Sequence, residues 1–249
     1  ILIFAAVLLV LVLTPLGKRV NGSARWIGFG PLTIQPSEVA KFAVVLYMSD
    51  YLVRRQDAVR ASLFNLWRAA LVVGGAVGLL MGEPDFGASL VLLVALFGML
   101  FLAGAPAKNF LIFLVAMVSG IVGLAFSAEY RVKRILSFWD AWDDAYGTDY
   151  QLSQSLIAFG RGDWFGVGLG HSVQKLFYLP EAHTDFIFAT MSEEWGLLGS
   201  LAVLAIVFGI LAKMSSIARQ SRTQFNRLLV MGLGINYFLY ITINTAMVM

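Results

Sequence analysis

The stretch YLPEAHTDFIFATMSEEWG, residues 178–196, leads directly into a long apolar run. An apolar run of this length is typical of a helix that crosses a membrane. The stretch nevertheless carries five ionisable side chains, and charged groups inside a membrane are costly unless they are paired or face water. A helix that begins at a water-accessible mouth of a bundle would explain both properties. The ionisable residues are Glu181, His183, Asp185, Glu193 and Glu194.

The composition of the whole chain indicates its class. Hydrophobic residues make up 59% of the 249 residues, charged residues make up 13%, and the mean hydropathy is +0.80. A soluble domain carries about a quarter charged residues, so this chain has too little polar surface for water. We therefore predict an all-α, polytopic helical membrane bundle. The net charge of +3 suits an anionic membrane surface and is too small to favour a nucleic-acid partner.

Seven apolar segments predict seven transmembrane helices within one transmembrane domain over residues 1–249. The chain begins and ends within apolar segments, so we expect it to be an internal piece of a longer protein. It contains no cysteine, which excludes disulfides and thiolate metal sites. No internal repeat stands out, which weakens the interpretation as an inverted-repeat transporter. The segments are 1–14, 36–53, 65–82, 86–104, 108–126, 184–212 and 226–249.

Basic residues in the short loops predict the orientation of the bundle. Nine of them lie in short loops on one side, against three on the other side, namely Lys18, Arg19 and Arg25. The positive-inside rule therefore places the side with nine in the cytoplasm and the long loop, residues 127–183, outside. That loop carries five basic residues of its own, but the rule applies to short loops. The nine residues are Arg54, Arg55, Arg60, Arg68, Lys108, Lys213, Arg219, Arg222 and Arg227.

The long outer loop is predicted to have structure of its own. It contains Trp139, Trp142 and Trp164, and its segment YQLSQSLIAFG, residues 150–160, has helical spacing. A loop of this length with its own structure is usually functional. Because it is rich in apolar and aromatic residues, we expect it to lie in the membrane interface or to fold back onto the bundle.

Asp185 has two compatible interpretations. After Pro180, either Thr184 or Asp185 can accept hydrogen bonds from the first free N–H groups of the helix and so cap it. A carboxylate at the outer mouth of a bundle can also face a cavity and act as a general base, a metal ligand or both. A helix N-terminus favours the ionised form that a base needs. Spacing alone favours Glu181 and His183 as solvated loop residues.

Two pairs of ionisable residues lie within the apolar segments. Glu38 and Lys41 are three residues apart, so they share a helix face and can pair. Such a pair is either structural or lines a polar cavity. Glu193 and Glu194 lie about two turns below Asp185. For at least one of them we favour a structural hydrogen bond between helices.

The hairpin GEPDFG and a glycine-rich segment hold further candidates. Asp85 of the hairpin can cap the helix that follows. It also lies on the same predicted outer face as Asp185, so the two could share a divalent cation that substrate phosphates complete. The glycines of 159–175 can form turns, or they can let backbone N–H groups approach a phosphate, with Arg161 and Lys175 as diphosphate partners. The spacing of these residues alone does not distinguish a protein that moves its substrate from an enzyme that reacts with it.

The segment HSVQKLFYLPEAHTDFIFA, residues 171–189, resembles the SEDS family (shape, elongation, division and sporulation), and within it the cell-division branch, FtsW, rather than the elongation branch, RodA. The similarity covers nearly the whole chain in order. Two departures are visible, because Glu83 stands where glutamine is expected and His171 where asparagine is expected. The other similar segments are ARWIGFGPLTIQPSEVAK (24–41), EPDFGASLVLLVALFGMLFLAGA (83–105), YRVKRILSFWDAW (130–142) and YQLSQSLIAFGRGDWFGVGLG (150–170).

The resemblance implies a ten-span inner-membrane glycosyltransferase, of which this chain holds spans three to nine. It would polymerise lipid II, a disaccharide-pentapeptide on undecaprenyl diphosphate, into peptidoglycan strands at the division septum. Asp185 matches the family's catalytic carboxylate, which would deprotonate the acceptor 4-hydroxyl for an inverting attack on the donor sugar. Expected substrate-binding residues are Arg25, Glu38, Lys41, Gln154, Arg161, Lys175, Glu181 and His183.

The resemblance also implies partners and a cofactor. We expect a class B penicillin-binding protein and other divisome membrane proteins as partners, and no nucleic acid. We expect a divalent cation, Mg²⁺ or Mn²⁺, with Asp85 and Asp185 as candidate ligands. A lipid II flippase and a scaffold that only recruits the penicillin-binding protein are the alternative functions.

Overall fold

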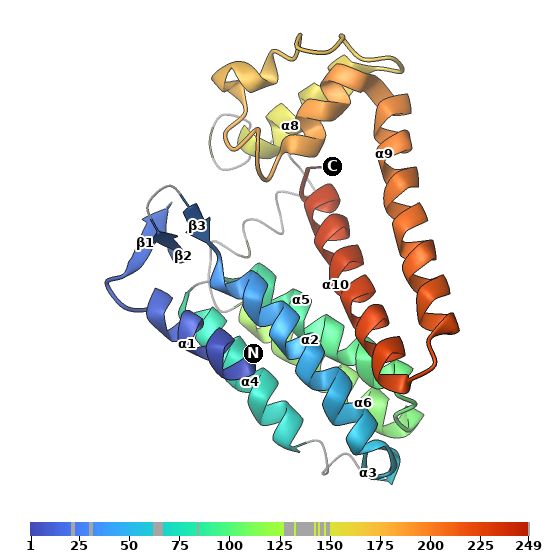
Figure 1. Ribbon diagram of the computed structural model, residues 1–249. Helices are drawn as coiled ribbons and strands as arrows, with labels where there is room; N and C mark the ends of the chain where they lie inside the picture. The colour runs from blue at the N-terminus through green and yellow to red at the C-terminus, as the bar shows by residue number, and fades with distance from the viewer. Residues whose placement is uncertain are drawn as a thin grey trace. The chain divides into compact units, whose positions relative to one another are not determined.

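The computed structural model describes residues 1–20, 23–29, 32–61, 67–83, 85–126, 132, 142, 144, 147 and 150–248. These residues are mostly helical and form two compact units (Figure 1). Unit 1 comprises Ile1–Ser119 and Met214–Tyr237, and unit 2 comprises Gly120–Lys213 and Phe238–Met249. We describe each unit by itself. One transmembrane domain over the whole chain stays a prediction.

The helices coincide with the seven predicted apolar segments. The two longest helices, α9 and α10, are long and apolar enough to cross a membrane. α2 begins at Pro36, whose fixed φ suits the first turn of a helix. The seven helices are α1 (Leu2–Val12), α2 (Pro36–Arg54), α4 (Trp67–Gly82), α5 (Phe86–Leu102), α6 (Ala107–Phe126), α9 (Ile187–Gln220) and α10 (Gln224–Val248).

α9 differs from its prediction at the C-terminal end. The predicted end at residue 212 is wrong, because the helix continues to Gln220. Lys213 and Arg219 therefore belong to the helix, and Arg219 lies in its last turn, where a basic side chain interacts favourably with the helix dipole. Only residues 221–223 separate α9 from α10.

A three-stranded antiparallel sheet precedes α2, and the apolar pattern does not predict it. β1 (Gly17–Val20) pairs with β2 (Ser23–Phe29), and β2 pairs with β3 (Leu32–Ile34). Figure 1 shows the sheet near the ends of α1 and α2, both of which β2 contacts. Ile27 of β2 is buried. The strands are short, and β1 consists mainly of loop-like polar residues, so the sequence shows no clear alternation over them.

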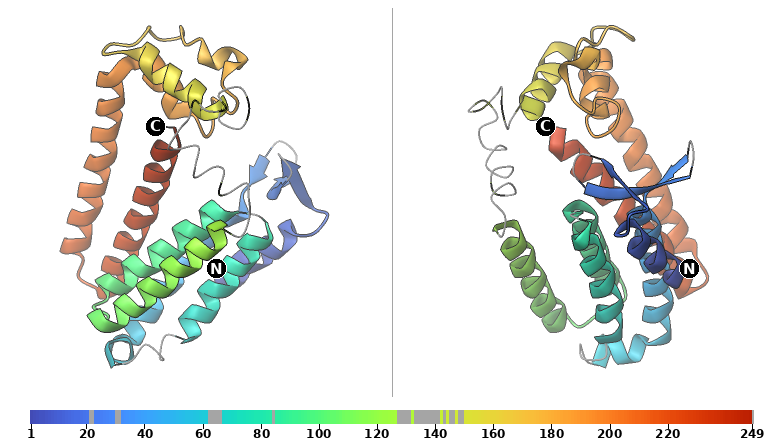
Figure 2. Two further views of the ribbon diagram at one scale, coloured as in Figure 1. Left: turned by 180° about the vertical axis from the view of Figure 1, so that it is seen from behind. Right: turned by 90° about the vertical axis from the view of Figure 1, so that its left-hand side faces the viewer.

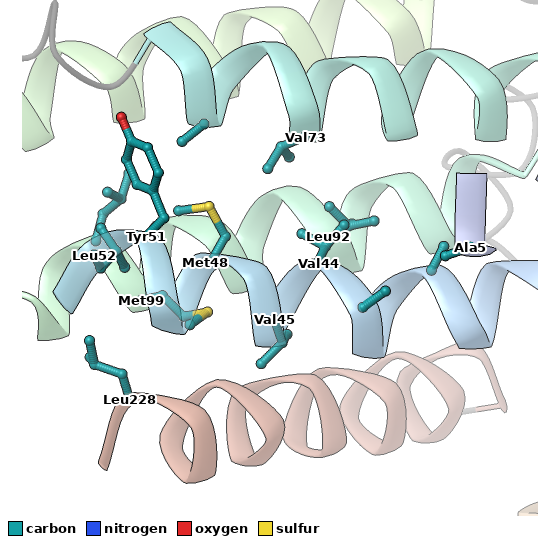
Figure 3. Packing of buried hydrophobic residues seen from close by; sticks show 14 of the residues in the cluster. Ala5, Val44, Val45, Met48, Tyr51, Leu52, Val73, Leu92, Met99 and Leu228 are labelled. Atoms are coloured by element: carbon teal, nitrogen blue, oxygen red, sulfur yellow. The ribbon is translucent and has the colours of Figure 1, made fainter. Parts of the chain in front are cut away.

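The core of unit 1 is built around α2. Val44 and Met48, which are four residues apart on one face of α2, pack in the same cluster as Leu92 of α5 and Leu228 of α10 (Figure 3). The views in Figure 2 show α2, α4 and α5 running side by side. A Cβ added at Gly232 of α10 would lie 2.8 Å from the side chain of Val45. A small residue at this position lets the two helices approach closely, as is common in membrane bundles.

Among the described residues of the predicted loops there are three short helices. α3 (Gln56–Ala61) follows α2, whereas α8 (Tyr150–Gly162) and η2 (Gln174–Tyr178), a single π-helical turn, belong to the predicted outer loop. α8 confirms the helix that the spacing of residues 150–160 predicts. Other predicted parts of that loop lie outside the described residues, namely Trp139 and the basic residues Arg131, Lys133 and Arg134.

Candidate active site

α9 is interrupted at Gly196, which has φ 68° and ψ −168°. This φ lies in the left-handed region, which glycine adopts without the steric cost of a Cβ. A break of this kind leaves backbone groups that need other partners. The carbonyls of Glu193 and Glu194 accept hydrogen bonds from the N–H groups of Val167 and Gly168, at 3.0 and 3.1 Å.

The same loop also satisfies the other side of the break. The N–H groups of Leu197 and Leu198 donate to the carbonyls of Asp163 and Trp164, at 2.8 and 3.2 Å. Residues 163–168 therefore complete the hydrogen bonding of α9 at the interruption. α9 and the loop after α8 form one structural element at this point.

Two glycines allow the close approach of this loop to α9. A Cβ added at Gly162 would lie 2.1 Å from the carbonyl oxygen of Ser192. A Cβ added at Gly166 would lie 2.1 Å from that of Glu194. The structure thus supports the turn interpretation of this glycine-rich segment. The N–H groups of Val167 and Gly168 already bind carbonyl oxygens of α9, not a phosphate.

Glu193 is fully buried and lies at the centre of a polar cluster. Its carboxylate accepts hydrogen bonds from Ser172 Oγ at 2.5 Å, from the Val173 N–H at 3.1 Å and from the Gln174 N–H at 3.2 Å. Nη1 of Arg161 lies 3.3 Å from Oε1. Glu193 therefore makes structural hydrogen bonds, as predicted for at least one of the two glutamates. Its partners come from α8 and from residues 172–174, rather than from another spanning helix.

Glu194 has a different partner. Its carboxylate lies 2.6 Å from Nζ of Lys175, and both side chains are partly exposed. Arg161 and Lys175, which the sequence predicts as diphosphate partners, therefore each pair with a glutamate of α9. The Arg161 side chain remains 44% exposed. Their contact with a diphosphate stays a prediction.

The loop that carries Asp185 is attached to unit 2 by apolar side chains. Leu179, Ala182 and Phe186 are buried and pack in one cluster with Ala158 of α8 and Ala189 of α9. The hydroxyl of Thr190 also donates to the carbonyl of Ala182, at 3.3 Å. Between these attachment points the ionisable residues of the loop are exposed, namely Glu181, His183 and Asp185.

Within the described residues, no donor binds the Asp185 carboxylate, so the helix-cap interpretation has no support there. The turn before α9 is instead organised by Glu181, which has a φ of 54°. Its carbonyl accepts hydrogen bonds from the N–H groups of Thr184 and Phe186, at 3.1 and 3.2 Å. Its carboxylate accepts one from the Thr184 hydroxyl at 2.9 Å. A non-glycine residue with positive φ is costly and is found preferentially at functional sites.

The ion pair predicted in α2 is present. Nζ of Lys41 lies 2.7 Å from Oε1 of Glu38, with the Lys41 side chain 9% exposed and that of Glu38 52% exposed. The pair therefore joins a buried ammonium to a carboxylate that reaches the surface. The other predicted contacts with the substrate lie elsewhere: Arg25 is half-buried on β2, and Gln154 is half-buried on α8.

Asp85 caps α5, as predicted. Its Oδ1 accepts a hydrogen bond from the Ala88 N–H at 3.1 Å, and the residue is buried. Asp85 belongs to unit 1 and Asp185 to unit 2. The described residues contain no group of three or more His, Cys, Asp or Glu side chains that could hold a metal. A divalent cation stays a prediction, and no step below depends on one.

Glu83, in the turn between α4 and α5, is a buried carboxyl that functional reasoning from the sequence overlooks. It is 1% exposed, and no described residue donates a hydrogen bond to either of its oxygens. Burial raises the pKa of Glu83 to about 7, the negative charge of Asp85 adds to the increase, and the positive charge of Arg25 opposes it. The one signal in the sequence is that the resemblance leads us to expect glutamine at this position.

We predict that Glu83→Gln removes a pH dependence of stability. The pKa of Glu83 is near 4.5 when unfolded and about 7 when folded, so the folded state holds the proton more tightly. Wild-type stability should therefore fall as pH rises from 4.5 to 7, by about 3 kcal/mol. Glutamine has no proton to lose, so the variant should gain stability over wild type across this window. Thermal unfolding of both proteins in detergent at pH 5 and pH 8 measures the effect, and an equal change in both would contradict it.

Comparison with known proteins confirms, over the whole chain, the family that the sequence resembles. The family model for the FtsW, RodA and SpoVE group, described as cell cycle protein, matches residues 1–249. The chain is 50% identical over 206 residues to a probable peptidoglycan glycosyltransferase FtsW of Pseudomonas fluorescens, covering 82% of this chain and 51% of the relative. It is 46% identical over 244 residues to the corresponding protein of Acinetobacter baylyi, covering 97% of this chain and 61% of the relative.

Two solved structures are similar to the fold. One comes from a study of how a peptidoglycan synthase complex coordinates polymerization and crosslinking, with a TM-score of 0.79 at 26% identity, covering 99% of this chain and 68% of that one. The other is the rod shape determining protein RodA of Thermus thermophilus, with a TM-score of 0.65 at 26% identity, covering 97% of this chain and 62% of that one. The chain thus spans about half to three-fifths of the length of its curated relatives, and it belongs to the FtsW/RodA/SpoVE family of polytopic membrane proteins.

Proposed function

We propose that the whole protein is a peptidoglycan glycosyltransferase that polymerises lipid II, with Asp185 as the general base. The observation that carries the proposal is the placement of Asp185. Its loop is fixed by the buried residues Leu179, Ala182 and Phe186, while Asp185 itself is exposed and free of hydrogen bonds to described residues. A base has to be accessible to its substrate and held by its surroundings, and this loop meets both conditions.

The proposed reaction is a single inverting transfer. The carboxylate of Asp185 takes the proton from the 4-hydroxyl of the acceptor N-acetylglucosamine. The resulting oxygen attacks C1 of the donor N-acetylmuramic acid, whose bond to the diphosphate oxygen breaks, and the configuration at C1 inverts. The products are a glycan strand longer by one disaccharide and undecaprenyl diphosphate. A sugar hydroxyl is a weak nucleophile, so a positioned base accelerates this step.

The diphosphate leaving group needs positive charge nearby. Arg161 supports this role best, because its guanidinium pairs with the buried Glu193 and its side chain is still 44% exposed. A guanidinium fixed from one side and open on the other is suited to bind a phosphate through its remaining N–H groups. We propose Lys175 as a second contact with the diphosphate, whereas a role of the Glu38–Lys41 pair in substrate binding rests on the family resemblance alone.

The partners and the location are proposed on the same basis. Because one structural neighbour belongs to a complex that couples polymerization to crosslinking, we propose a class B penicillin-binding protein as the partner of this chain. The relatives named FtsW support a place at the division septum of the cytoplasmic membrane, together with other divisome membrane proteins.

The test uses the full-length protein with its crosslinking partner, purified in detergent and supplied with labelled lipid II. We expect glycan strands that separate by length on a gel. A flippase has no reaction to perform without two leaflets, so polymer formed in detergent distinguishes the two functions. An intact complex that leaves lipid II unchanged would contradict the proposal and would fit either a flippase or a scaffold.

A further inference from the structure

We propose that Glu193 is a positioning residue for this transfer reaction, because it fixes the start of the segment that carries Asp185. This inference rests on the proposed function. Glu193 has no exposed surface, so it is not placed to touch the substrate. Any effect of Glu193 on the reaction therefore has to pass through other residues, and the structure shows which ones.

The connection runs through consecutive hydrogen bonds. Glu193 holds Ser172, Val173 and Gln174, the residues that lead into η2. The carbonyl of Gln174 then accepts a hydrogen bond from the Leu179 N–H at 2.9 Å. Leu179 is the first of the buried side chains that attach the Asp185 loop to unit 2. Glu193 thus fixes the beginning of the segment, and the apolar cluster fixes the part that holds Asp185.

The chemistry of Glu193 makes this attachment specific. All four of its polar partners are donors: one hydroxyl, two backbone N–H groups and the Arg161 guanidinium. A carboxylate offers two acceptor oxygens, which suits these donors. Glutamine has nearly the same shape but replaces one oxygen by an NH₂ group. This NH₂ group is itself a donor, so it could not accept hydrogen bonds from the partners of Glu193. Buried donors that lose their acceptor are costly, and the segment would shift to find other partners.

Glu194 provides a matched control in the next position. Its carboxylate pairs with Lys175, and both side chains are partly exposed to solvent. An ion pair of this kind contributes little, because water replaces the lost interaction. Glu194→Gln therefore removes the same charge from the same helix and leaves the hydrogen bonds that Glu193 accepts from residues 172–174 in place. The remaining side-chain oxygen of the variant can still accept from the backbone of Gly170 and Ser172, which the Glu194 carboxylate also contacts.

The experiment compares Glu193→Gln and Glu194→Gln in the full-length protein bound to its crosslinking partner. Hydrogen–deuterium exchange reports on backbone order in residues 172–186, and lipid II polymerisation gives kcat and KM. For Glu193→Gln we expect faster exchange across this segment and a kcat lower by about tenfold to a hundredfold, with KM changed by less than about threefold. For Glu194→Gln we expect exchange close to wild type and a much smaller fall in kcat.

Wild-type exchange or wild-type kcat in a folded Glu193→Gln protein would overturn the inference. If that variant does not fold, Ser172→Ala takes its place, because it removes one donor and keeps the carboxylate; it should increase exchange and lower kcat by about threefold. Wild-type hydrogen–deuterium exchange in residues 172–186 together with a wild-type kcat in the Ser172→Ala protein would also overturn the inference. A wild-type protein without polymerase activity would instead contradict the proposed function, while the exchange data would still show whether Glu193 orders the segment.

Discussion

Asp185→Asn is expected to lower the rate of lipid II polymerisation by about a hundredfold to ten-thousandfold, the range attributed to a general base. Asparagine has the shape of aspartate but cannot accept the proton of the acceptor hydroxyl at neutral pH. Asp185 is exposed and no described residue donates a hydrogen bond to its carboxylate, so the substitution leaves the packing of its loop intact. The loss should therefore appear in the rate and not in thermal stability or partner binding.

Asp163→Asn is the matched control for this prediction. Asp163 is also an exposed aspartate of unit 2, and it has a positive φ of 45°, which asparagine tolerates. Its structural contact is made by its backbone carbonyl, which both residues possess. Single-turnover polymerisation with labelled lipid II measures both variants beside wild type. An Asp185→Asn protein that elongates strands at the wild-type rate would show that another group removes the proton.

The sequence predicts the seven long helices because each contains an apolar run, although the end of α9 extends beyond its run. Pro36 at the start of α2 and Asp85 before α5 are local signals, and both act as predicted. The Glu38–Lys41 pair follows from a spacing of three residues on one helix. Local signals of this kind depend on neighbours along the chain, and the sequence shows those neighbours directly.

The interruption of α9 and the surroundings of Glu193 could not be predicted in the same way. Gly196 stands at the start of the apolar run of α9, and glycine is common in membrane helices, so it does not by itself indicate a break. The donors to Glu193 lie 19 to 21 residues earlier in the chain, in a loop without regular spacing. The pairing of Arg161 with Glu193 likewise arises only when α8 and α9 meet.

Gly162→Ala is expected to lower the free energy of unfolding by about 3 kcal/mol, the upper end of the usual range for overpacking. The added Cβ would lie 2.1 Å from the carbonyl oxygen of Ser192 and 3.1 Å from the Cα of Glu193. These are backbone atoms, which cannot rotate away as a flexible side chain can. α8 would have to move from α9, and this movement would weaken both the hydrogen bonds at the Gly196 break and the Arg161–Glu193 pair.

Gly160→Ala isolates this effect from helix propensity. Gly160 lies in the same helix two residues earlier, and a Cβ there would meet nothing within 4 Å. Alanine in a helix is more stable than glycine by about 0.5–1 kcal/mol, so this variant should unfold at or slightly above the wild-type temperature. Thermal unfolding of the full-length proteins in detergent compares wild type, Gly162→Ala and Gly160→Ala. Equal midpoints for the two alanine variants would mean that α8 and α9 do not depend on backbone contact at Gly162, because only this contact distinguishes the two positions.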